Sequence, residues 1–324
     1  MKVLVTGGAG YIGSHTVKLL RRAGHQPVIF DNFSTGKREL AQASEVIEAD
    51  LADGQALGAA FRQHRFEAVL HFASLIQAGE SWADPQKYYR HNLVNSLNLL
   101  EAMLAAGVKK LIFSSSAAVY GLPRRIPVTE DHPLEPANPY GQTKLFLEKI
   151  LQEFDRAYGL RSISLRYFNA AGADPEGELG EMHEPETHLI PNILNFLLGR
   201  RDKLEIYGTD FETPDGTAVR DYIHVSDLAQ AHLLALELLA SEGRSDAINL
   251  GTNRAYSVRE VIKKTEEVTG RKVTFLSRPR RQGDVPVLRA SKDKAAAVLG
   301  WKLHHSELET ILRTAWAWHR KFVR

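Results

Sequence analysis

Tyr140 and Lys144 form the pair of residues in this sequence whose types and spacing could move a proton. The chain contains 10 tyrosines, and Tyr140 is the one with a lysine four residues later. On a helix this spacing places both side chains on one face. A phenol has a pKa of about 10, and a neighbouring ammonium group would lower that pKa and make a phenolate base available near neutral pH. The alternative is an exposed tyrosine and lysine on a helix face, so the pair needs support from its surroundings.

A run of serines, Ser114 to Ser116, supplies part of that support. It follows a short apolar segment that is predicted to be a buried strand. Ligands of doubly wound α/β folds bind at the carboxyl ends of such strands. A hydroxyl there could share a hydrogen bond between Tyr140 and a bound molecule, whereas the alternative is a polar strand end that satisfies its own backbone.

A glycine-rich segment lies between the first predicted strand and the first predicted helix. Gly8, Gly10 and Gly13 have the Gly-x-Gly-x-x-Gly spacing, and a Gly-x-x-Gly-x-x-Gly pattern starts at Gly7. Glycines allow a sharp turn and the close approach of a pyrophosphate, whose charge suits the free N–H groups at a helix N-terminus. Three such glycines can also be a simple tight turn. The strand before them and the helix after them favour a dinucleotide site.

Asp31 ends the second predicted strand, near the spacing at which an acidic residue accepts hydrogen bonds from the adenosine ribose. A carboxylate there would repel the extra phosphate of NADP, which favours NAD as the cofactor. The Asp31-Asn32 pair is also good turn chemistry, and the basic residues 37–38 weaken the inference. The Asp50-Leu51 pair, after the third strand, could flank the adenine or cap the next helix.

These residues require a fold that brings them to one edge. The first half alternates short apolar runs with helical patterns, which predicts an α/β Rossmann fold: a doubly wound parallel sheet with right-handed crossovers. The apolar runs are continuous rather than alternating, as expected for strands covered on both faces. Strands are predicted at 3–5, 28–30, 46–47, 68–72, 111–113 and 163–167, and helices at 12–22, about 85–106 and 140–159.

The second half has shorter elements. Residues 172–188 look like a loop with several prolines, glycines and acidic residues. A helix is predicted at 190–198, a strand at 204–207 and an apolar helix at about 225–240. We therefore expect an NAD-binding Rossmann domain at 1–171 and a smaller mixed α/β substrate domain at 172–324.

The composition excludes several classes of protein. The chain has 324 residues, of which 44% are hydrophobic and 25% charged, as in a globular protein of about two domains. Lys plus Arg is 41 and Asp plus Glu is 39, which lacks the basic excess of a nucleic-acid binder. With no cysteine, disulfides and thiolate chemistry are excluded. No apolar run resembles a signal peptide or a membrane span, so we expect a cytoplasmic protein without a membrane partner.

Several longer blocks, taken in order, resemble the extended short-chain dehydrogenase/reductase superfamily, and within it the sugar-nucleotide 4-epimerases. The resemblance covers essentially the whole chain and is more specific than the glycine pattern alone. The blocks are Thr6–His15, His71–Ala73, Phe113–Gly121, Pro139–Lys144, Leu165–Asn169, Asp215–Val225 and Arg281–Asp284.

The resemblance implies an NAD-dependent isomerase of galactose metabolism that interconverts UDP-glucose and UDP-galactose. The sugar would be oxidised at carbon 4, reoriented as a 4-keto intermediate and reduced again on its other face. It implies that Tyr140 is the base, that Lys144 lowers the pKa of Tyr140 and binds the nicotinamide ribose, and that Ser116 relays or positions the proton. A homodimer formed through the helices near Asn92 and Tyr140 is also implied.

The same resemblance assigns binding residues. The cofactor contacts implied are Gly7, Gly10, Tyr11, Ile12, Gly13, Asp31, Asn32, Asp50, Leu51, Phe72, Ala73, Ser74, Asn92, Ser114, Tyr140, Lys144 and Phe168. The sugar-nucleotide contacts implied are Ser116, Tyr140, Asn169, His188, Leu189, Tyr207, Arg220, Arg281, Asp284 and Leu288. Arg220 and Arg281 would neutralise the diphosphate and Asp284 would bind the uridine ribose. The alternative for each arginine is a surface ion pair, which suits Arg281 better than Arg220.

One detail of the sequence separates epimerisation from related reactions. Dehydratases of the superfamily usually carry an Asp-Glu pair soon after the serine, and related decarboxylases commonly have Glu there. This chain has Ala117 and Ala118, which cannot transfer protons. Three further positions depart from the family pattern or vary within it. Ile76 stands where many members have a lysine that contacts the cofactor, and His91 stands where an Asn is common. Leu288 lies at the position that sets the room for an N-acetyl group, and leucine there leaves both plain and N-acetylated UDP-sugars as candidate substrates.

The sequence also allows other functions. The chain could be another UDP-sugar epimerase, acting on UDP-GlcNAc and UDP-GalNAc or on a pentose form, or a dinucleotide-sensing protein without catalysis. The presence of Ser116, Tyr140 and Lys144 favours an enzyme. His183, Glu184 and His188 lack His-Glu-x-x-His spacing, so we expect a solvated loop and no metal. No Gly-x-Ser-x-Gly motif supports a serine hydrolase.

Overall fold

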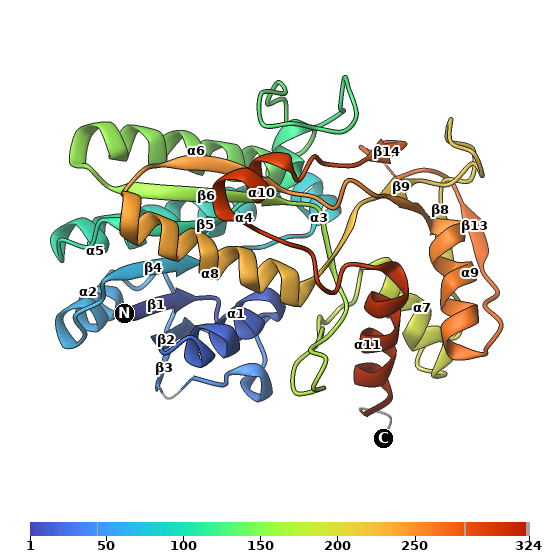
Figure 1. Cartoon of the computed structure of the whole chain (residues 1–324), viewed down its shortest axis with the longest axis horizontal. Coiled ribbons are helices and arrows are strands. Elements are labelled where there is room, and N and C mark those ends of the chain that lie inside the picture. Colours follow the sequence, from blue (N-terminus) through green and yellow to red (C-terminus); the bar gives the residue numbers. More distant parts are fainter. Residues whose placement is uncertain (44, 282, 322–324) are drawn as a thin grey trace.

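The computed structural model describes residues 1–43, 45–281 and 283–321, and is built on one large parallel sheet (Figure 1). The sheet has seven strands in the order β11-β6-β5-β4-β1-β2-β3. The strands are β1 (Lys2–Thr6), β2 (Gln26–Asp31), β3 (Glu45–Glu48), β4 (Ala68–His71), β5 (Lys110–Ser114), β6 (Arg161–Tyr167) and β11 (Asp246–Leu250). Every pairing in this sheet is parallel, which confirms the doubly wound Rossmann fold.

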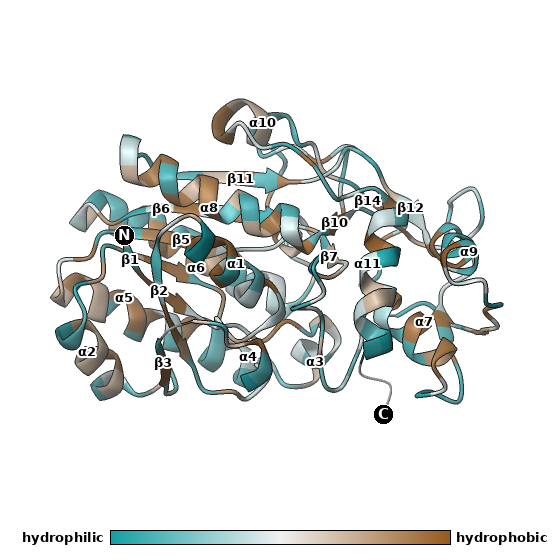
Figure 2. Ribbon diagram, turned by 60° about the horizontal axis from the view of Figure 1, so that its bottom comes forward, coloured by the Kyte–Doolittle hydropathy of each residue, from teal (hydrophilic) through white to brown (hydrophobic). Residues whose placement is uncertain are grey.

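Helices cover both faces of the sheet, because successive side chains of each strand point to opposite faces. Val3 and Val5 of β1 pack with α1 (Tyr11–Arg22) and α8 (Val225–Glu242) on one face. Leu4, between them, packs on the other face with α2 (Gly54–Gln63), α5 (Asn95–Ala105) and α6 (Pro139–Tyr158). Figure 2 shows the hydrophobic colour on the strands between these helices. Continuous apolar runs therefore correspond to strands that are buried on both sides.

The predicted helix at about 85–106 is interrupted. It consists of α4 (Pro85–Tyr89), a π-helical turn η2 (Arg90–Val94) and α5, and α3 (Ala78–Ala83) precedes it. Proline at the first position and the Asp84 carboxylate, which accepts a hydrogen bond from the N–H of Lys87, begin α4. Two short 3₁₀ turns also occur, η1 (Arg38–Leu40) and η3 (Ala117–Tyr120).

The second half forms a smaller body of mixed structure, at the right of Figure 1. Its small sheets pair β7 (Asn169–Ala171) with β10 (Tyr222–His224), and β8 (Glu205–Tyr207) with β13 (Leu276–Arg278). A third places β9 (Val219–Arg220) between β12 (Tyr256–Ser257) and β14 (Val287–Leu288). The helices α7 (Leu189–Leu197), α9 (Val258–Thr269) and α11 (Leu308–Lys321) enclose a separate apolar core.

The chain path differs from the predicted division at 171/172. After β10 the chain returns to the large sheet: α8 packs beside α1, β11 pairs with β6, and α10 (Asp293–Leu299) joins the same core. The apolar face of α8, including Leu228 and Leu236, is fully buried there. A single cut at that boundary therefore does not separate the two bodies. Within the described residues, no helix is both long and apolar enough to cross a membrane.

Candidate active site

A cavity of about 510 Å³ lies at the carboxyl edge of the large sheet. Its walls come from the segments that follow β1, β2, β3, β4, β5 and β6, together with the first turns of α6 and the segment 181–188. This is the edge at which doubly wound sheets bind ligands.

The glycine segment of the cavity wall leaves no room for side chains. A Cβ on Gly7, which has φ of +71°, would lie 2.6 Å from the Ala73 nitrogen. A Cβ on Gly13 would lie 2.3 Å from the Gly7 carbonyl oxygen. Gly10 is the N-cap of α1 and has no side chain to cover the helix end. The bare backbone at a helix N-terminus fits the pyrophosphate of a dinucleotide.

Asp31 and Asn32 lie where the adenosine end of a dinucleotide is expected. The Asp31 carboxylate accepts hydrogen bonds of 2.9 Å from the N–H groups of Ala9 and Phe33, so it also serves its own turn. Burial raises the pKa of Asp31, and the two hydrogen bonds oppose that rise. The amide of Asn32 donates to Asp50 at 2.6 Å, which joins the ends of β2 and β3.

Ser116, Tyr140 and Lys144 all line the cavity. Tyr140 is the second residue of α6, where Asn138 caps the helix by accepting the N–H of Gly141 at 2.8 Å. The Ser116 side chain acts on the Tyr140 phenol and favours its ionised form. Lys144 is buried, and its Nζ donates to the Ser114 carbonyl at 2.9 Å.

The electrostatics of this group differ from the expectation. Burial raises the pKa of Tyr140, and the Ser116 side chain only opposes that rise. Lys144 Nζ points to Ser114 and lies 5.8 Å from the centroid of the Tyr140 ring. Burial also lowers the pKa of Lys144 to about 7, against the attraction of Glu148. Burial therefore sets the direction of both shifts, and the expected lowering of the Tyr140 pKa by Lys144 is not seen here.

The segment 181–188 is only partly the solvated loop that its composition suggested, because Glu184 is exposed whereas Glu181 is not. Glu181 is buried, and its carboxylate lies 2.8 Å from Nδ1 of both His183 and His188. Glu186 completes a group whose ligand atoms all lie within 4.8 Å of one another. Pairing of imidazoles with carboxylates accounts for these contacts. His188 also lines the cavity.

A second group of predicted residues gathers in the smaller body, outside the cavity wall. Arg281 lies over the ring of Tyr207, with 5.2 Å from the guanidinium carbon to the ring centroid, and its Nε is 3.2 Å from Asp284. Leu288 pairs with Arg220 across β14 and β9. Burial lowers the pKa of Arg220, Asp284 raises it and Arg281 lowers it further. Gln282, within the same motif, lies outside the described residues.

The cavity gathers most of the predicted cofactor residues. Gly7, Gly10, Tyr11, Ile12, Gly13, Asp31, Asn32, Asp50, Leu51, Phe72, Ala73, Ser74, Ser114, Ser116, Tyr140, Lys144, Phe168, Asn169 and His188 line it, as do Ile76 and His91. Asn92 and Leu189 do not line it. The Asn92 side chain instead binds both backbone groups of Leu75, at 2.8 and 2.9 Å. Leu189 packs with the core of the smaller body.

Some lining residues carried no recognised sequence signal. Glu80, Lys87 and Tyr88 form one wall, where the Glu80 carboxylate accepts from Lys87 at 2.6 Å and from Tyr88 at 2.9 Å. Tyr167 lines the cavity too, and its place beside Phe168 in a quoted block could have identified it. Glu181 gave no signal, because its burial depends on the path of a loop.

The sheet, the glycine segment and the Ser116–Tyr140–Lys144 group define a Rossmann-fold enzyme of the short-chain dehydrogenase/reductase type. The model of the NAD dependent epimerase/dehydratase family matches residues 3–251, and the chain belongs to this family.

Individual relatives are similar over nearly their whole length. The UDP-glucose 4-epimerase of Rhizobium leguminosarum bv. trifolii is 49% identical over 98% of this chain and 97% of that protein. The crystal structure of UDP-glucose 4-epimerase from Brucella ovis in complex with NAD has a TM-score of 0.95 and 50% identity, covering 97% of each chain. That of the enzyme from Bifidobacterium longum, in complex with NAD+ and UDP, has a TM-score of 0.95 and 38% identity, covering 99% of each chain.

Proposed function

We propose that this protein is an NAD-dependent enzyme that interconverts UDP-glucose and UDP-galactose. The observation that carries the proposal is the meeting of Ser116, Tyr140 and Lys144 in the cavity that also contains the glycine segment. The Rhizobium leguminosarum relative, similar over nearly its whole length, is a UDP-glucose 4-epimerase, and the solved structures from Brucella ovis and Bifidobacterium longum hold NAD, or NAD+ and UDP.

In this proposal Tyr140 removes the proton of the sugar 4-hydroxyl, and Ser116, whose side chain favours the ionised phenol, positions that proton. Bound NAD supplies the chemistry of hydride acceptance from carbon 4 and its return. Lys144, one turn along α6 from Tyr140, is proposed to bind the nicotinamide ribose. Because the group can act as both base and acid, it serves either direction of the reaction.

The residues after Ser116 support epimerisation over elimination. Ala117 and Ala118 begin η3, and the N–H of Ala118 donates to the Ser116 hydroxyl oxygen at 3.1 Å. Neither side chain can supply the acid or base that removal of water from carbons 5 and 6 requires. The oxidised sugar is therefore left to turn over and be reduced again.

The sugar nucleotide is proposed to reach from the cavity to the arginines of the smaller body. Arg220 and Arg281 offer guanidinium groups suited to a diphosphate, and Asp284 offers an acceptor for ribose hydroxyls. His188 faces the cavity, and pairing with Glu181 raises its pKa, which favours a cation there. The large sheet would thus hold NAD and the smaller body the UDP-sugar.

Three finer statements belong to the same proposal. A homodimer formed through the helices near Asn92 and Tyr140 is supported by Val94 of η2, a large apolar side chain that is 46% exposed. A cytoplasmic location, as expected from the sequence, is part of the same proposal. Leu288, half-buried on β14, leaves activity on N-acetylated and pentose UDP-sugars as the second candidate.

Purified protein tests the proposal directly. We expect the absorbance of bound NAD and conversion of UDP-galactose to UDP-glucose without an added reductant. The assay is run beside UDP-GalNAc and a UDP-pentose, which separates the alternative epimerases. A protein that binds NAD and converts none of these sugars would instead be a dinucleotide sensor.

A further inference from the structure

Three successive turns of α6 contact the serine run at the end of β5. Tyr140 is influenced by the Ser116 side chain, Lys144 donates to the Ser114 carbonyl at 2.9 Å, and Glu148 accepts from the Ser115 hydroxyl at 2.6 Å. The three α6 residues are four positions apart and so share one helix face. The first two belong to the group proposed to perform the reaction. Glu148 does not line the cavity, and the proposed function gives it no role.

Glu148 is held in a buried ion pair. Its side chain is 2% exposed and that of Arg166, on β6, is 4% exposed. Arg166 Nε donates to Oε1 of Glu148 at 3.0 Å, and Nη2 donates to Oε2. A buried pair of this kind contributes little net stability, because desolvation of both charges offsets their attraction. Stability alone is therefore a weak reason for its presence.

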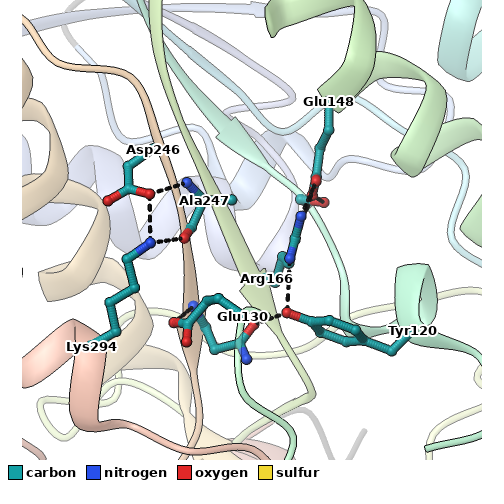
Figure 3. A network of polar contacts seen from close by, with 9 residues as sticks. Tyr120, Glu130, Glu148, Arg166, Asp246, Ala247 and Lys294 are labelled. Carbon is teal, nitrogen blue, oxygen red and sulfur yellow. Dashed lines mark hydrogen bonds and ion pairs between the residues drawn. The ribbon is translucent and has the colours of Figure 1, made fainter. Parts of the chain in front are cut away.

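The pair continues into a network that crosses the sheet (Figure 3). Arg166 Nη1 donates to the Tyr120 hydroxyl at 2.8 Å, and that hydroxyl donates to Asn249 of β11 at 2.7 Å. The N–H of Asn249 in turn donates to Glu130 at 2.8 Å. Through Arg166 the Glu148 carboxylate is anchored to β6 and β11, so it can hold α6 and the serine run at a set distance.

The charges around Lys144 give the carboxylate a second effect. On α6 the Lys144 ammonium group faces Tyr140 and Glu148. On β4 it faces His71, whose pKa burial and Lys144 lower to about 3, so that His71 is neutral. The Phe113 ring of β5 lies 5.0 Å from Nζ, and β6 contributes Arg166, already paired with Glu148, and Tyr167, whose pKa burial raises. Among these groups Glu148 is the anion, and it favours the ammonium form of Lys144 against the cost of burial.

We propose that Glu148 is a positioning residue for the reaction: its carboxylate keeps Lys144 charged and holds Ser114–Ser116 against α6. Its effect on turnover rests on the proposed function, whereas its effect on Lys144 does not. Neither Ser115 nor Arg166 touches the reacting atoms in this arrangement, so both act through Glu148.

The test replaces Glu148 with glutamine, which retains an acceptor for Ser115 and removes the charge. We expect the pKa of Lys144 to fall by about one unit or more in Glu148→Gln. The Lys144 pKa is measured by NMR titration of ¹³C-labelled lysine Cε. The Lys144 signal is assigned by its loss in Lys144→Arg. The alkaline limb of the kcat profile should move to lower pH by a similar amount. Glu153→Gln, at an exposed glutamate of the same helix, is the matched control and should change neither.

A second variant covers the case in which Glu148→Gln does not fold, since it leaves Arg166 buried without its partner. Glu148→Gln combined with Arg166→Gln removes both charges, and we expect the Lys144 pKa still to fall. If the Lys144 pKa in whichever variant folds equals the wild-type pKa, the proposal is overturned in favour of a purely structural ion pair. Failure of both variants to fold would overturn it in the same way. If the wild-type protein converts no UDP-sugar, the proposed function fails, but the NMR titration still decides the role of Glu148.

Discussion

Nδ1 of His188 lies 2.8 Å from the Glu181 carboxylate, and that same carboxylate also lies 2.8 Å from Nδ1 of His183. The two imidazoles favour the ionised form of Glu181 and so lower its pKa, despite its burial. The carboxylates of Glu181 and Glu186 in turn raise the pKa of His188. One anion thus joins two histidines of the segment 181–188, which forms part of the cavity wall.

This relationship predicts a pH-dependent contribution to stability. The raised pKa of His188 stabilises the folded state. This contribution is fully present below pH 6.5, the ordinary histidine pKa, and is lost as the pH rises through the raised pKa. A lowered glutamate pKa stabilises fully above its ordinary value of 4.5. We expect the fall in Tm caused by Glu181→Gln to be largest between pH 4.5 and 6.5 and smaller toward pH 9. Thermal unfolding across this range checks it, with Glu184→Gln, at a glutamate that is 83% exposed, as the control. A fall of equal size at every pH would contradict the prediction.

Removal of the Tyr140 hydroxyl should abolish turnover with little change in folding. We expect Tyr140→Phe to lower kcat by roughly 10²- to 10⁴-fold, the usual size of a lost general acid or base. Tyr158→Phe is the matched control, because Tyr158 lies on the same helix and is 51% exposed. Conversion of UDP-galactose is the measurement, and near-normal kcat in Tyr140→Phe would rule out the proposed base.

A methyl group at Gly13 should disrupt the dinucleotide site. Its Cβ would lie 2.3 Å from the Gly7 carbonyl oxygen, so the turn before α1 must shift. We expect Gly13→Ala to lose bound NAD and to cost about 1–3 kcal/mol of stability, as overpacking does. Gly54→Ala is the control, because nothing lies within 4 Å of its Cβ at the start of α2. Cofactor content by absorbance and the free energy of unfolding would be compared, and unchanged NAD content in Gly13→Ala would refute the assignment.

Replacement of Arg220 should weaken binding of the sugar nucleotide and leave the cofactor in place. Arg220 lies on β9, apart from the cavity wall that contains the glycine segment. We expect Arg220→Met to raise KM for UDP-galactose by at least about tenfold, because a charged hydrogen bond to phosphate contributes roughly 1.5–3 kcal/mol. Arg278→Met, at a surface arginine paired with Glu205 at 2.6 Å, is the control. Steady-state kinetics together with NAD content checks this, and an unchanged KM would remove Arg220 from the site.

Much of the site was predictable because its parts are local. The glycine segment, Asp31 and the serine run each follow a strand, and parallel strands bring such positions to one edge whatever the rest of the chain does. The spacing of Tyr140 and Lys144 works in the same way, since one helix carries both. Periodicity also located every strand of the large sheet except β11. The segment Asp246–Leu250 includes Asp246 and Asn249 and has no continuous apolar run.

What the chain determined by itself was therefore the fold class, the dinucleotide edge and the Tyr-Lys pair, because hydrophobic periodicity and short-range spacing encode them. Tertiary structure decided the remainder. The return of α8 and β11 to the large sheet, the burial of Glu181 and the Glu148–Arg166 pair all join residues far apart in the sequence or depend on how a loop packs. The direction of the Tyr140 and Lys144 pKa shifts belongs to the same class, because desolvation depends on everything packed around a group.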